Sequence, residues 1–573
     1  MRTHTCGELT KTHIGKTVQL CGWIRAIRTH GGVKFIDLRD RYGITQIVFN
    51  SSNKDMYDKI SKLGKESVIQ AKGNAQKRKA GPNPALATGD IEVIVEKFKV
   101  LSKAESLPME IDDEITSTDE TRLKYRYLDL RRPCMLNNFV MRHNVITAAR
   151  EFFNNHKFLE IETPMLVKST PEGARDYVVP SRVNPGKFYA LPQSPQLYKQ
   201  LLMIAGFDRY YQLARCMRDE DLRQDRQPEH TQLDFEMSFV NQDAILAFVQ
   251  GLYKHIFKKV LGMNMDDFPA FTYKEAMNKF GTDKPDLRFG LEISDVTFAA
   301  KKSEFGVFKN AECVKCLNPA KEFSRKEFDK YTEFCKKVGA HGLVYGKVTD
   351  KGIDSSISKF LSVDIQNEII GFANAKNGTS LLFIADTEIK ANKVLGQLRL
   401  KLADDLKLRD DSYKFCFVND FPLFSWNEDE KKWEPEHHMF SMPKEEFVKD
   451  FENRPEEVVG DLWDVVLNGL ELGSGSIRVS DPKIQERIMN FVGIDHKEAM
   501  EKFGFLLQAY KYGGPVHGGM GLGVDRLVAL MVGQTDIREV IVFPKNKNAE
   551  CPMDGSPSEI NKEQMKELGL KPA

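Results

Sequence analysis

Two short segments of this 573-residue chain carry side chains that could hold a polyphosphate. The segment 216–221 reads CMRDED and follows a strand-like run, so it offers Arg218 and carboxylates at the end of a strand. The segment 519–526 reads GMGLGVDR, in which glycines let a ligand lie against the backbone before Arg526 opens a helix. Taken alone, the first segment also fits a solvated charged surface, and the second also fits an ordinary glycine turn. Together they supply two cations for phosphates and acids for a metal or an adenine.

Further polar residues lie in segments that could adjoin these two. The loop 170–177 presents a carboxylate, and the segment 193–200 predicts a helix with Ser194 as N-cap and Lys199 inside it. The segment 471–478 again combines an acid, glycines and an arginine, with Asp464 seven residues earlier, two helical turns if that piece is helical. Because side chains alternate along a strand, three further polar residues are expected on one face of the same strand: Gln232, Asp234 and Glu236.

Composition indicates a multidomain globular protein. At 573 residues the chain is too long for one core, so three or four domains are expected, and the 41% hydrophobic content is ordinary. No apolar run is long enough to span a membrane, and the N-terminus lacks the apolar core of a signal peptide. Nine scattered cysteines favour a reducing cytoplasm. The CxxC at 313–316 lacks nearby partner ligands for zinc, which favours two free thiols in a loop.

Charge is distributed unevenly along the chain. Residues 1–104 contain 19 Lys/Arg and 9 Asp/Glu, although the whole chain carries only +1. This segment also reads as five short strands with one helix after the third, the pattern of an oligonucleotide-binding barrel. A basic barrel is expected to contact a polyanion, although a merely soluble basic domain has the same charge.

The rest of the chain divides by pattern. A polar linker near 103–120 precedes a long helix at about 135–156, a strand and a proline at 164. Residues 290–412 alternate helices and strands, for example a helix at 328–338 and a strand at 342–348, and few candidate catalytic groups cluster there. We interpret them as an inserted domain that the chemistry of the two opening segments does not need.

These motifs, in this order, resemble motifs two and three of class II aminoacyl-tRNA synthetases. The segments 125–131, 170–177, 193–199, 207–212 and 218–229 resemble the bacterial type of aspartyl-tRNA synthetases within class IIb. The resemblance implies an α+β multidomain fold: an N-terminal OB-fold β-barrel, a catalytic domain built on an antiparallel sheet, and an inserted α+β domain of the GAD-like kind. The expected boundaries are 1–104 for the barrel, 105–289 and 413–557 for the catalytic domain, 290–412 for the insertion and 558–573 for the tail.

The resemblance implies a two-step reaction. ATP and L-aspartate form aspartyl-adenylate, and the aspartyl group then passes to tRNA. Arg218, Glu220 and Arg526 are the expected catalytic residues, and Asp464 and Glu471 the expected ligands of Mg²⁺. The expected ATP contacts are Arg218, Asp219, Glu220, Gln227, Glu471, Gly523, Val524, Asp525 and Arg526.

Aspartate selection requires cations for the side-chain carboxylate. The resemblance assigns this role to Arg478 and Lys199, with Asp234 orienting them. A metal site remains an alternative for His437 and His438, and Met439 stands where the family has proline. The expected L-aspartate contacts are Glu172, Ser194, Gln196, Lys199, Arg218, Gln232, Asp234, His437, His438 and Arg478.

The barrel is expected to bind the anticodon. Phe35 fits both a stacking platform and a core position, and His30 with Gly81 resembles the forms that accept tRNA(Asn) as well as tRNA(Asp). The expected anticodon contacts are Arg28, His30, Phe35, Gln46, Arg78, Gly81 and Glu92. The resemblance further implies a cytoplasmic homodimer without a membrane.

Three rival functions remain at this point. An asparaginyl or lysyl enzyme of class IIb shares the motifs, but the former has no need for two cations and the latter needs acids. A non-catalytic tRNA-binding paralogue is expected to lose Arg218, Glu471 or Arg526, all of which are present. An amidating synthetase that acts without tRNA would lack the basic barrel.

Overall fold

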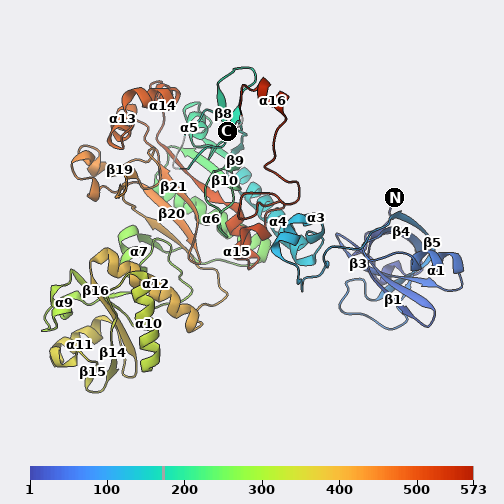
Figure 1. Ribbon diagram of the computed structural model, residues 1–573, viewed down its shortest axis with the longest axis horizontal. Helices are drawn as coiled ribbons and strands as arrows, with labels where there is room; N and C mark the ends of the chain where they lie inside the picture. Colours follow the sequence, from blue (N-terminus) through green and yellow to red (C-terminus); the bar gives the residue numbers. More distant parts are fainter. Residues whose placement is uncertain (171–173, 572–573) are drawn as a thin grey trace. The chain divides into compact units, whose positions relative to one another are not determined.

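A computed structural model describes residues 1–170 and 174–571, which form two compact units. One unit comprises Met1–Asn137 with Cys551–Ser556, and the other comprises Asn138–Glu550 with Pro557–Ala573. Figure 1 labels the elements of both. None of the described helices is long and apolar enough to cross a membrane.

The first unit contains a closed barrel with the strand order β1-β2-β3-β5-β4. Its elements are β1 (Thr17–His30), β2 (Val33–Asp40), β3 (Gly43–Asn50), α1 (Lys54–Ser61), β4 (Val68–Lys77) and β5 (Ile91–Ser102). The barrel closes through the parallel pair of β3 and β5, and alternate residues such as Ile36, Leu38 and Ile47 are buried inside it. The five strands with one helix after the third confirm the predicted OB-fold. The same unit also contains the 3₁₀ turn η1 (Lys11–His13), which precedes β1, and the short helices α2 (Asp119–Lys124) and α3 (Arg126–Asp129), which follow β5.

The second unit is built on an eight-stranded sheet whose central six strands are antiparallel. In order, the strands are β11 (Ala270–Thr272), β17 (Phe415–Asn419), β20 (Leu462–Leu467), β21 (Leu470–Ile477), β22 (His517–Gly523), β10 (Glu229–Ser238), β9 (Arg209–Met217) and β6 (Leu159–Glu160). This arrangement confirms the predicted antiparallel-sheet domain.

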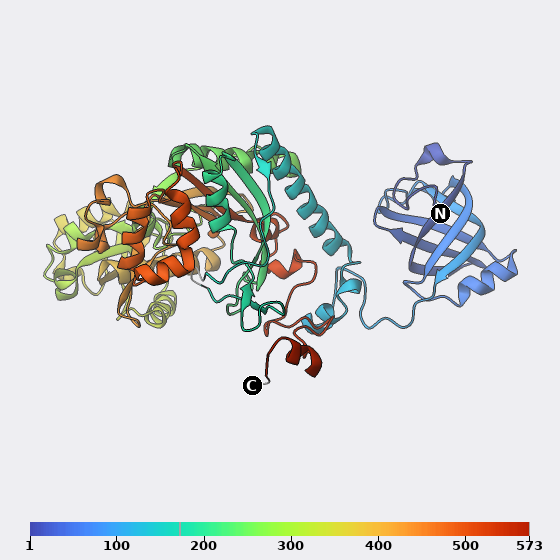
Figure 2. The same cartoon turned by 90° about the horizontal axis from the view of Figure 1, so that it is seen from above.

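One face of this sheet carries the main hydrophobic core. Phe235 of β10 and Met520 of β22 pack there against α4 (Pro133–Asn155), α6 (Gln242–Leu261) and α15 (Val524–Met531). Figure 2 shows α4, in cyan, beside the strands. Because side chains alternate along a strand, the neighbours Asp234 and Glu236 lie on the opposite face, where the polar residues gather. The other helices are α5 (Gln196–Ile204), α7 (Tyr273–Phe280), α13 (Pro482–Phe491), α14 (His496–Tyr510) and α16 (Lys562–Glu567). The second unit also contains two small hairpins, β7 (Val178–Pro180) with β8 (Phe188–Ala190), and β18 (Phe424–Asn427) with β19 (Lys432–Pro435).

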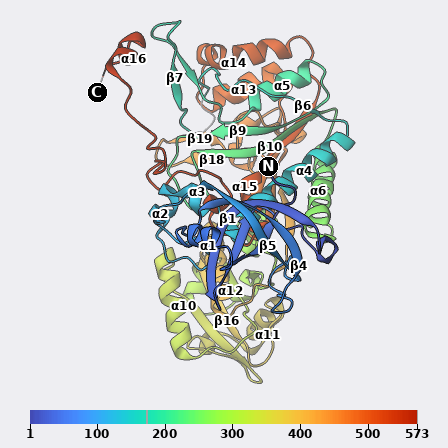
Figure 3. The same cartoon turned by 90° about the vertical axis from the view of Figure 1, so that its right-hand side faces the viewer.

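A five-stranded sheet forms between β11 and β17, where the chain leaves and rejoins the large sheet. Its strands, in order, are β12 (Ser294–Asp295), β13 (Cys313–Leu317), β16 (Ser380–Asp386), β14 (Val344–Thr349) and β15 (Gly352–Asp354). Figure 3 shows helices on both faces of this sheet. The helices α10 (Arg325–Val338) and α12 (Glu388–Asp405) share one core, and α8 (Thr297–Ala300), α9 (Gly306–Asn310) and α11 (Val363–Phe372) share the other.

Three local predictions were wrong. Cys313 and Cys316 lie buried on strand β13 rather than in a loop, although both are free thiols. The N-cap of α5 is Pro195, and Ser194 instead accepts a hydrogen bond of 3.3 Å from the backbone N–H of Gln196. The piece between Asp464 and Glu471 is a β-hairpin, not a helix, because the turn at 468–469 joins two strands of the large sheet.

Candidate functional site

A polar cavity of about 340 Å³ opens on the face of the large sheet opposite the core. Arg218, Glu220 and Gln227 come from the connection between β9 and β10, and Arg526 comes from the first turn of α15. The described residues that line it also include Asp225, Arg226, His230, Gln232, Glu471, Leu472, Gly473, Ser474, Gly521, Gly523, Asp525 and Ile537. The two motifs from which the sequence argument began therefore face one cavity.

Glycines make the floor of this cavity possible. A Cβ atom at Gly521 would lie 2.1 Å from Nε2 of Gln232, and one at Gly519 would lie 2.0 Å from the carbonyl oxygen of Phe235. A Cβ at Gly519 would therefore collide with the backbone of β10, and one at Gly521 would displace the side-chain amide of Gln232. Glycine at these positions lets β22 lie close to β10 and leaves its backbone open to a ligand.

The two arginines are held at the cavity in different ways. Arg526 donates from NH1 to the carbonyl of Glu471 at 2.9 Å and from NH2 to Asp225 at 3.3 Å. Arg218 is fixed through its backbone N–H, which donates to Pro228 at 2.8 Å, and its buried Nε has no hydrogen-bond partner among the described residues. An unpaired buried guanidinium nitrogen favours an anionic ligand at that point.

The neighbouring acids are occupied by protein contacts. Glu220 pairs with Arg226 at 3.1 Å. Asp525 uses one carboxylate oxygen on Arg142 and the other on the backbone N–H of Thr231. Asp525 therefore positions α15 against β10 and α4. Gln227 makes a reciprocal pair of bonds with the backbone of Lys545, at 3.2 and 2.8 Å.

A buried ionic cluster lies beside the cavity. Lys199 of α5 contacts Asp234 at 2.9 Å and Glu236 at 3.1 Å. Arg478 donates to both carboxylate oxygens of Glu236, at 2.8 and 3.1 Å. All four side chains of this cluster (Lys199, Asp234, Glu236, Arg478) are at most 2% exposed. Sequence periodicity placed Glu236 on this face but did not reveal that it joins the two cations.

The pKa directions show how the charge of the cluster is balanced. Burial alone would raise the pKa of Glu236, but Arg478 and Lys199 outweigh it and lower the pKa to about 2. Burial raises the pKa of Asp234 despite the charge of Lys199. The second oxygen of Asp234 has no hydrogen-bond partner among the described residues. The cluster thus pairs two cations with two acids, of which Asp234 is the one whose ionised form burial disfavours.

His438 occupies the remaining side of Arg478. NH1 of Arg478 lies 2.8 Å from Nε2 of His438 and donates to Ser476 at 2.6 Å. Burial and the charge of Arg478 hold the pKa of His438 well below its usual range, so the ring is neutral. The other ring nitrogen, Nδ1, lies 3.3 Å from the backbone N–H of Phe440, which can donate to it, and 3.3 Å from the hydroxyl of Ser441. A neutral ring accepts at one nitrogen only, so Arg478 and Phe440 compete for its single acceptor.

His437 points to a different partner, the carboxylate of Asp464, at 3.0 Å. Burial, opposed by the charge of His437, raises the pKa of Asp464 to about 6. Burial disfavours the charged form of His437, but Asp464 outweighs this and raises its pKa. Glu471, on the adjacent strand, adds a second carboxylate whose charge contributes to both shifts.

The pair Asp464 and Glu471 fits a divalent hard cation. Both supply carboxylate oxygens, Glu471 lines the polar cavity, and Asp464 is 2% exposed. Among the described residues no cluster of three or more His, Cys, Asp or Glu side chains forms a protein-only metal site. A cation here would complete its coordination with ligand oxygens or water, as Mg²⁺ does at phosphates.

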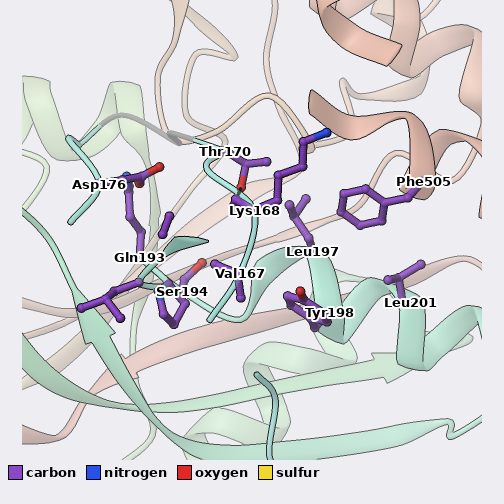
Figure 4. Close-up of a pocket in the computed structure, with 13 residues that line it drawn as sticks. Val167, Lys168, Thr170, Asp176, Gln193, Ser194, Leu197, Tyr198, Leu201 and Phe505 are labelled. Carbon is purple, nitrogen blue, oxygen red and sulfur yellow. Dashed lines mark hydrogen bonds between the residues drawn. The ribbon is translucent and has the colours of Figure 1, made fainter. Parts of the chain in front are cut away.

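A second, more apolar cavity of about 230 Å³ lies against helix α5 (Figure 4). Its wall combines Ser194 with Tyr198 and Leu201 of α5, Phe505 of α14 and the strand-like segment around Val167. The loop residue Glu172, an expected aspartate contact, lies outside the described residues. The amide nitrogen of Gln196, another expected contact, is buried without a hydrogen-bond partner among the described residues.

Comparison with known proteins identifies the family. The model of "tRNA synthetases class II (D, K and N)" matches residues 118–547, and an OB-fold nucleic acid binding domain matches residues 18–101.

The chain belongs to the class II tRNA synthetases.

Two relatives cover essentially the whole chain. The Aspartate--tRNA(Asp/Asn) ligase of Caldanaerobacter subterraneus subsp. tengcongensis is 49% identical, over 100% of this chain and 98% of its own. The protein of the same name from Treponema denticola is 48% identical, over 99% of this chain and 98% of its own.

Among solved structures, asparaginyl-tRNA synthetase from Pyrococcus horikoshii, complexed with asparaginyl-adenylate, matches with a TM-score of 0.61 at 20% identity, over 94% of this chain and 97% of that chain. Aspartyl tRNA synthetase from Entamoeba histolytica matches with a TM-score of 0.58 at 19% identity, over 94% and 90%. The two structures support the class II synthetase fold.

The barrel of this synthetase carries the expected anticodon residues on three sides. Arg28 makes a bidentate pair with Asp37 at 2.7 and 2.6 Å, and Phe35 lies directly opposite Arg28 on β2, half-buried. Gln46 and Glu92 are buried and bond to each other at 2.9 Å. Both side chains are therefore occupied by a protein partner in this structure.

The loop residues of the barrel remain accessible. His30 is exposed at the end of β1. Gly81 adopts a left-handed conformation with φ of +85°, and nothing lies within 4 Å of the position a Cβ would take. Arg78 has a buried NH1 without a hydrogen-bond partner among the described residues. An unpaired guanidinium nitrogen beside an open loop favours contact with a nucleic acid.

Sequence reasoning missed several residues of the synthetase site. Asp225 and His230 became visible only through the fold. The position of Glu236 on the polar face was predicted, but its ion pairs were not, because its partners are distant in sequence. For Glu236 the period-two pattern of β10 was the available signal. Burial and the charge of Arg218 lower the pKa of His230 to about 4, so this cavity residue is neutral.

Proposed function

We propose that this synthetase joins L-aspartate to tRNA(Asp) through aspartyl-adenylate. The observation that carries the proposal is the pair Lys199 and Arg478, two buried cations on the polar face of the large sheet. The side-chain carboxylate of aspartate supplies a negative charge that pairs with such cations. Asparagine supplies none, and the ammonium of lysine would be repelled.

Substrate binding is expected to rearrange one contact. His438 holds Arg478 at 2.8 Å, and a neutral imidazole is a weaker acceptor than a carboxylate. The aspartate carboxylate therefore replaces His438 on NH1 of Arg478, while Glu236 keeps the guanidinium in place. Gln196 and Gln232 lie on the same face, where they can receive the rest of the amino acid.

The first chemical step takes place in the polar cavity. An α-carboxylate oxygen of aspartate attacks the α-phosphorus of ATP, a P–O bond forms, and pyrophosphate leaves. Arg218 faces the reacting phosphate and Arg526 the terminal one, so charge neutralisation and positioning carry most of the rate. In the second step the 3′-terminal hydroxyl of tRNA attacks the acyl carbon, and AMP leaves.

Asp464 and Glu471 are the residues of this chain that would hold Mg²⁺. A bound Mg²⁺ supplies positive charge to the phosphate oxygens of ATP. His437 orients Asp464 through the bond of 3.0 Å and so fixes the direction of its carboxylate.

Pyrophosphate exchange tests the amino-acid assignment. Exchange between ATP and labelled pyrophosphate is expected with L-aspartate and not with L-asparagine or L-lysine at equal concentration. Exchange driven by asparagine instead would establish the rival class IIb activity. Absence of exchange with all three would support a non-catalytic paralogue.

tRNA(Asn) is proposed as a second acceptor. The relatives named above carry both tRNAs in their names, and exposed His30 and open Gly81 leave room at the predicted anticodon groove. Charging of purified tRNA(Asp) and tRNA(Asn) transcripts tests this, with an unrelated tRNA as control. If tRNA(Asn) is charged no better than the unrelated control tRNA, the enzyme is specific for tRNA(Asp). The double variant His30→Leu with Gly81→Lys is expected to favour tRNA(Asp), with Gly81→Asn as a control for the strained backbone.

A homodimer in the cytoplasm completes the proposal. Exposed apolar side chains cluster after α4, where Leu159 and Leu166 are each 52% exposed and Met165 is 39% exposed. A partner subunit would cover them. Light scattering on the full chain is expected to give about twice the monomer mass of 65.4 kDa.

A further inference from the structure

A lysine outside all of the matched motifs reaches the proposed metal carboxylates. Lys284 lies in the segment 281–289, between α7 and the five-stranded sheet. Its ammonium is 3.1 Å from Asp283 and 3.4 Å from Glu471, and its side chain is 39% exposed. It therefore approaches the polar cavity from the side of the inserted region.

The segment that carries Lys284 is held firmly on both sides. Asp286, which is 2% exposed, accepts from Arg288 at 3.0 and 2.7 Å and from Arg409 at 3.0 Å. Arg399 of α12 is fully buried and donates to the backbone carbonyls of Asp286 and Phe289, at 2.8 and 3.2 Å. The position of Lys284 is thus set by helix α12 and by Arg409, which follows that helix.

The other side of the segment packs on the hairpin that carries the carboxylates. Gly469, in the turn between β20 and β21, has a φ of +83°, and a Cβ there would lie 3.2 Å from Cβ of Asp286. The same hairpin presents Asp464 and Glu471. The turn at Gly469 therefore contacts the segment 281–289, which leads into the inserted region, and joins the two strands that carry the proposed metal ligands.

We propose that Lys284 is a further ATP-binding residue, which exchanges its ion pair with Glu471 for the departing pyrophosphate end of ATP. This rests on the proposed function. Mg²⁺ and an ammonium compete for the same carboxylate, since two cations repel each other at short range. When the carboxylate takes the metal ion, Lys284 keeps its neighbour Asp283 at 3.1 Å, and the flexible four-carbon stem of lysine lets the ammonium turn toward the phosphates of ATP.

The first test measures metal binding without ATP. Mn²⁺ is titrated into the ligand-free full-length enzyme and followed by electron paramagnetic resonance. Lys284→Met removes the competing ammonium and is expected to tighten Mn²⁺ binding about two- to fivefold, the range that a half-exposed ion pair supports. Lys279→Met is the matched control, because Lys279 lies on the adjacent α7 and pairs with Glu292 at 4.0 Å, away from the carboxylates.

The second test measures pyrophosphate exchange. Lys284→Met is expected to lower exchange about ten- to a hundredfold through ATP and pyrophosphate, with the KM for aspartate unchanged, and Lys284→Arg to restore most of it. Melting temperatures establish that each variant is folded. If Lys284→Met matches Lys279→Met in both Mn²⁺ affinity and exchange, Lys284 forms a surface ion pair only and the inference is overturned. Wild-type enzyme without aspartate-dependent exchange would instead refute the proposed function, and the Mn²⁺ titration would still report on the competition.

Discussion

Arg478 is the residue on which the proposed selection of aspartate depends most directly. Lysine at this position keeps a charge beside Glu236 but loses the paired hydrogen bonds to Glu236 and the proposed contact with the substrate. Arg478→Lys is expected to raise the KM for aspartate at least about a hundredfold, by analogy with the roughly 3–5 kcal/mol of a broken buried pair. ATP binding, measured by calorimetry, is expected to stay unchanged.

A leucine at position 478 is the harsher variant and needs a folding control. It would leave Glu236 ionised and buried with only Lys199 for a partner. The double variant Arg478→Leu with Glu236→Gln removes that unpaired charge. If either folded variant keeps near wild-type aspartate affinity, Arg478 does not select aspartate.

Arg526 belongs to the ATP end of the cavity. Arg526→Ala removes its contacts to Asp225 and to the carbonyl of Glu471 together with the proposed phosphate contact. Exchange is expected to fall by roughly 10²–10³, as for loss of a preorganised donor, with little change in the KM for aspartate. Unchanged ATP dependence would remove Arg526 from the site.

Asp461 offers a pH-dependent effect that is separate from catalysis. Burial, with Lys444 opposing it, raises the pKa of this carboxyl from 3.8 to about 6. An acid whose folded pKa is raised stabilises the fold below pH about 4 and loses that contribution as pH rises through about 6. Asp461→Asn is therefore expected to be about 1–3 kcal/mol more stable than wild type at pH 7.5, with the advantage vanishing by pH 4. Melting temperatures across this range provide the measurement, and an advantage independent of pH would contradict the assignment.

At the scale of elements, the hairpin β20–β21 links the inserted region to the site. The sequence argument treated residues 290–412 as dispensable for adenylate formation, because none of the matched residues lies there. The structure places Arg399 and Arg409 in that range, where they fix the segment that carries Lys284.

Deletion of residues 290–412 is accordingly expected to depress pyrophosphate exchange about as much as Lys284→Met does, about ten- to a hundredfold. The physical reason is the loss of the arginine contacts to Asp286. The variant Arg409→Met, in the full chain, provides a milder control with the helices intact. A folded deletion variant with wild-type exchange would show that the segment 281–289 keeps its position unaided.

At the scale of the whole molecule, we expect the basic barrel to serve tRNA binding and not adenylate formation. Deletion of residues 1–104, which carry a balance of +10, is expected to spare pyrophosphate exchange and to reduce tRNA charging strongly. Binding of tRNA to the full chain is expected to weaken with salt, and this salt dependence should flatten in the truncated form. The deletion also removes Glu66, which pairs with Arg131 at 3.0 Å. A melting curve of the truncated form is therefore needed to show that it is folded. Intact charging by the folded truncation would contradict the anticodon role.

The sequence by itself determined the parts of this protein that are local. Strand alternation in residues 17–102 predicted the barrel, and the motif around Arg218 and the glycines before Arg526 predicted the two walls of one cavity. Such features depend on periodicity and on the conformational freedom of glycine, which neighbouring residues decide.

Only the tertiary structure decided which distant charges meet. It placed Asp464 and Glu471 on a hairpin rather than a helix, joined Arg478 to Glu236 across 242 residues of sequence, and brought Lys284 to Glu471. None of these pairs has a signature in local spacing, because strand order in the large sheet and burial beside it create them. Their pKa values likewise follow from burial and from partners that only packing supplies.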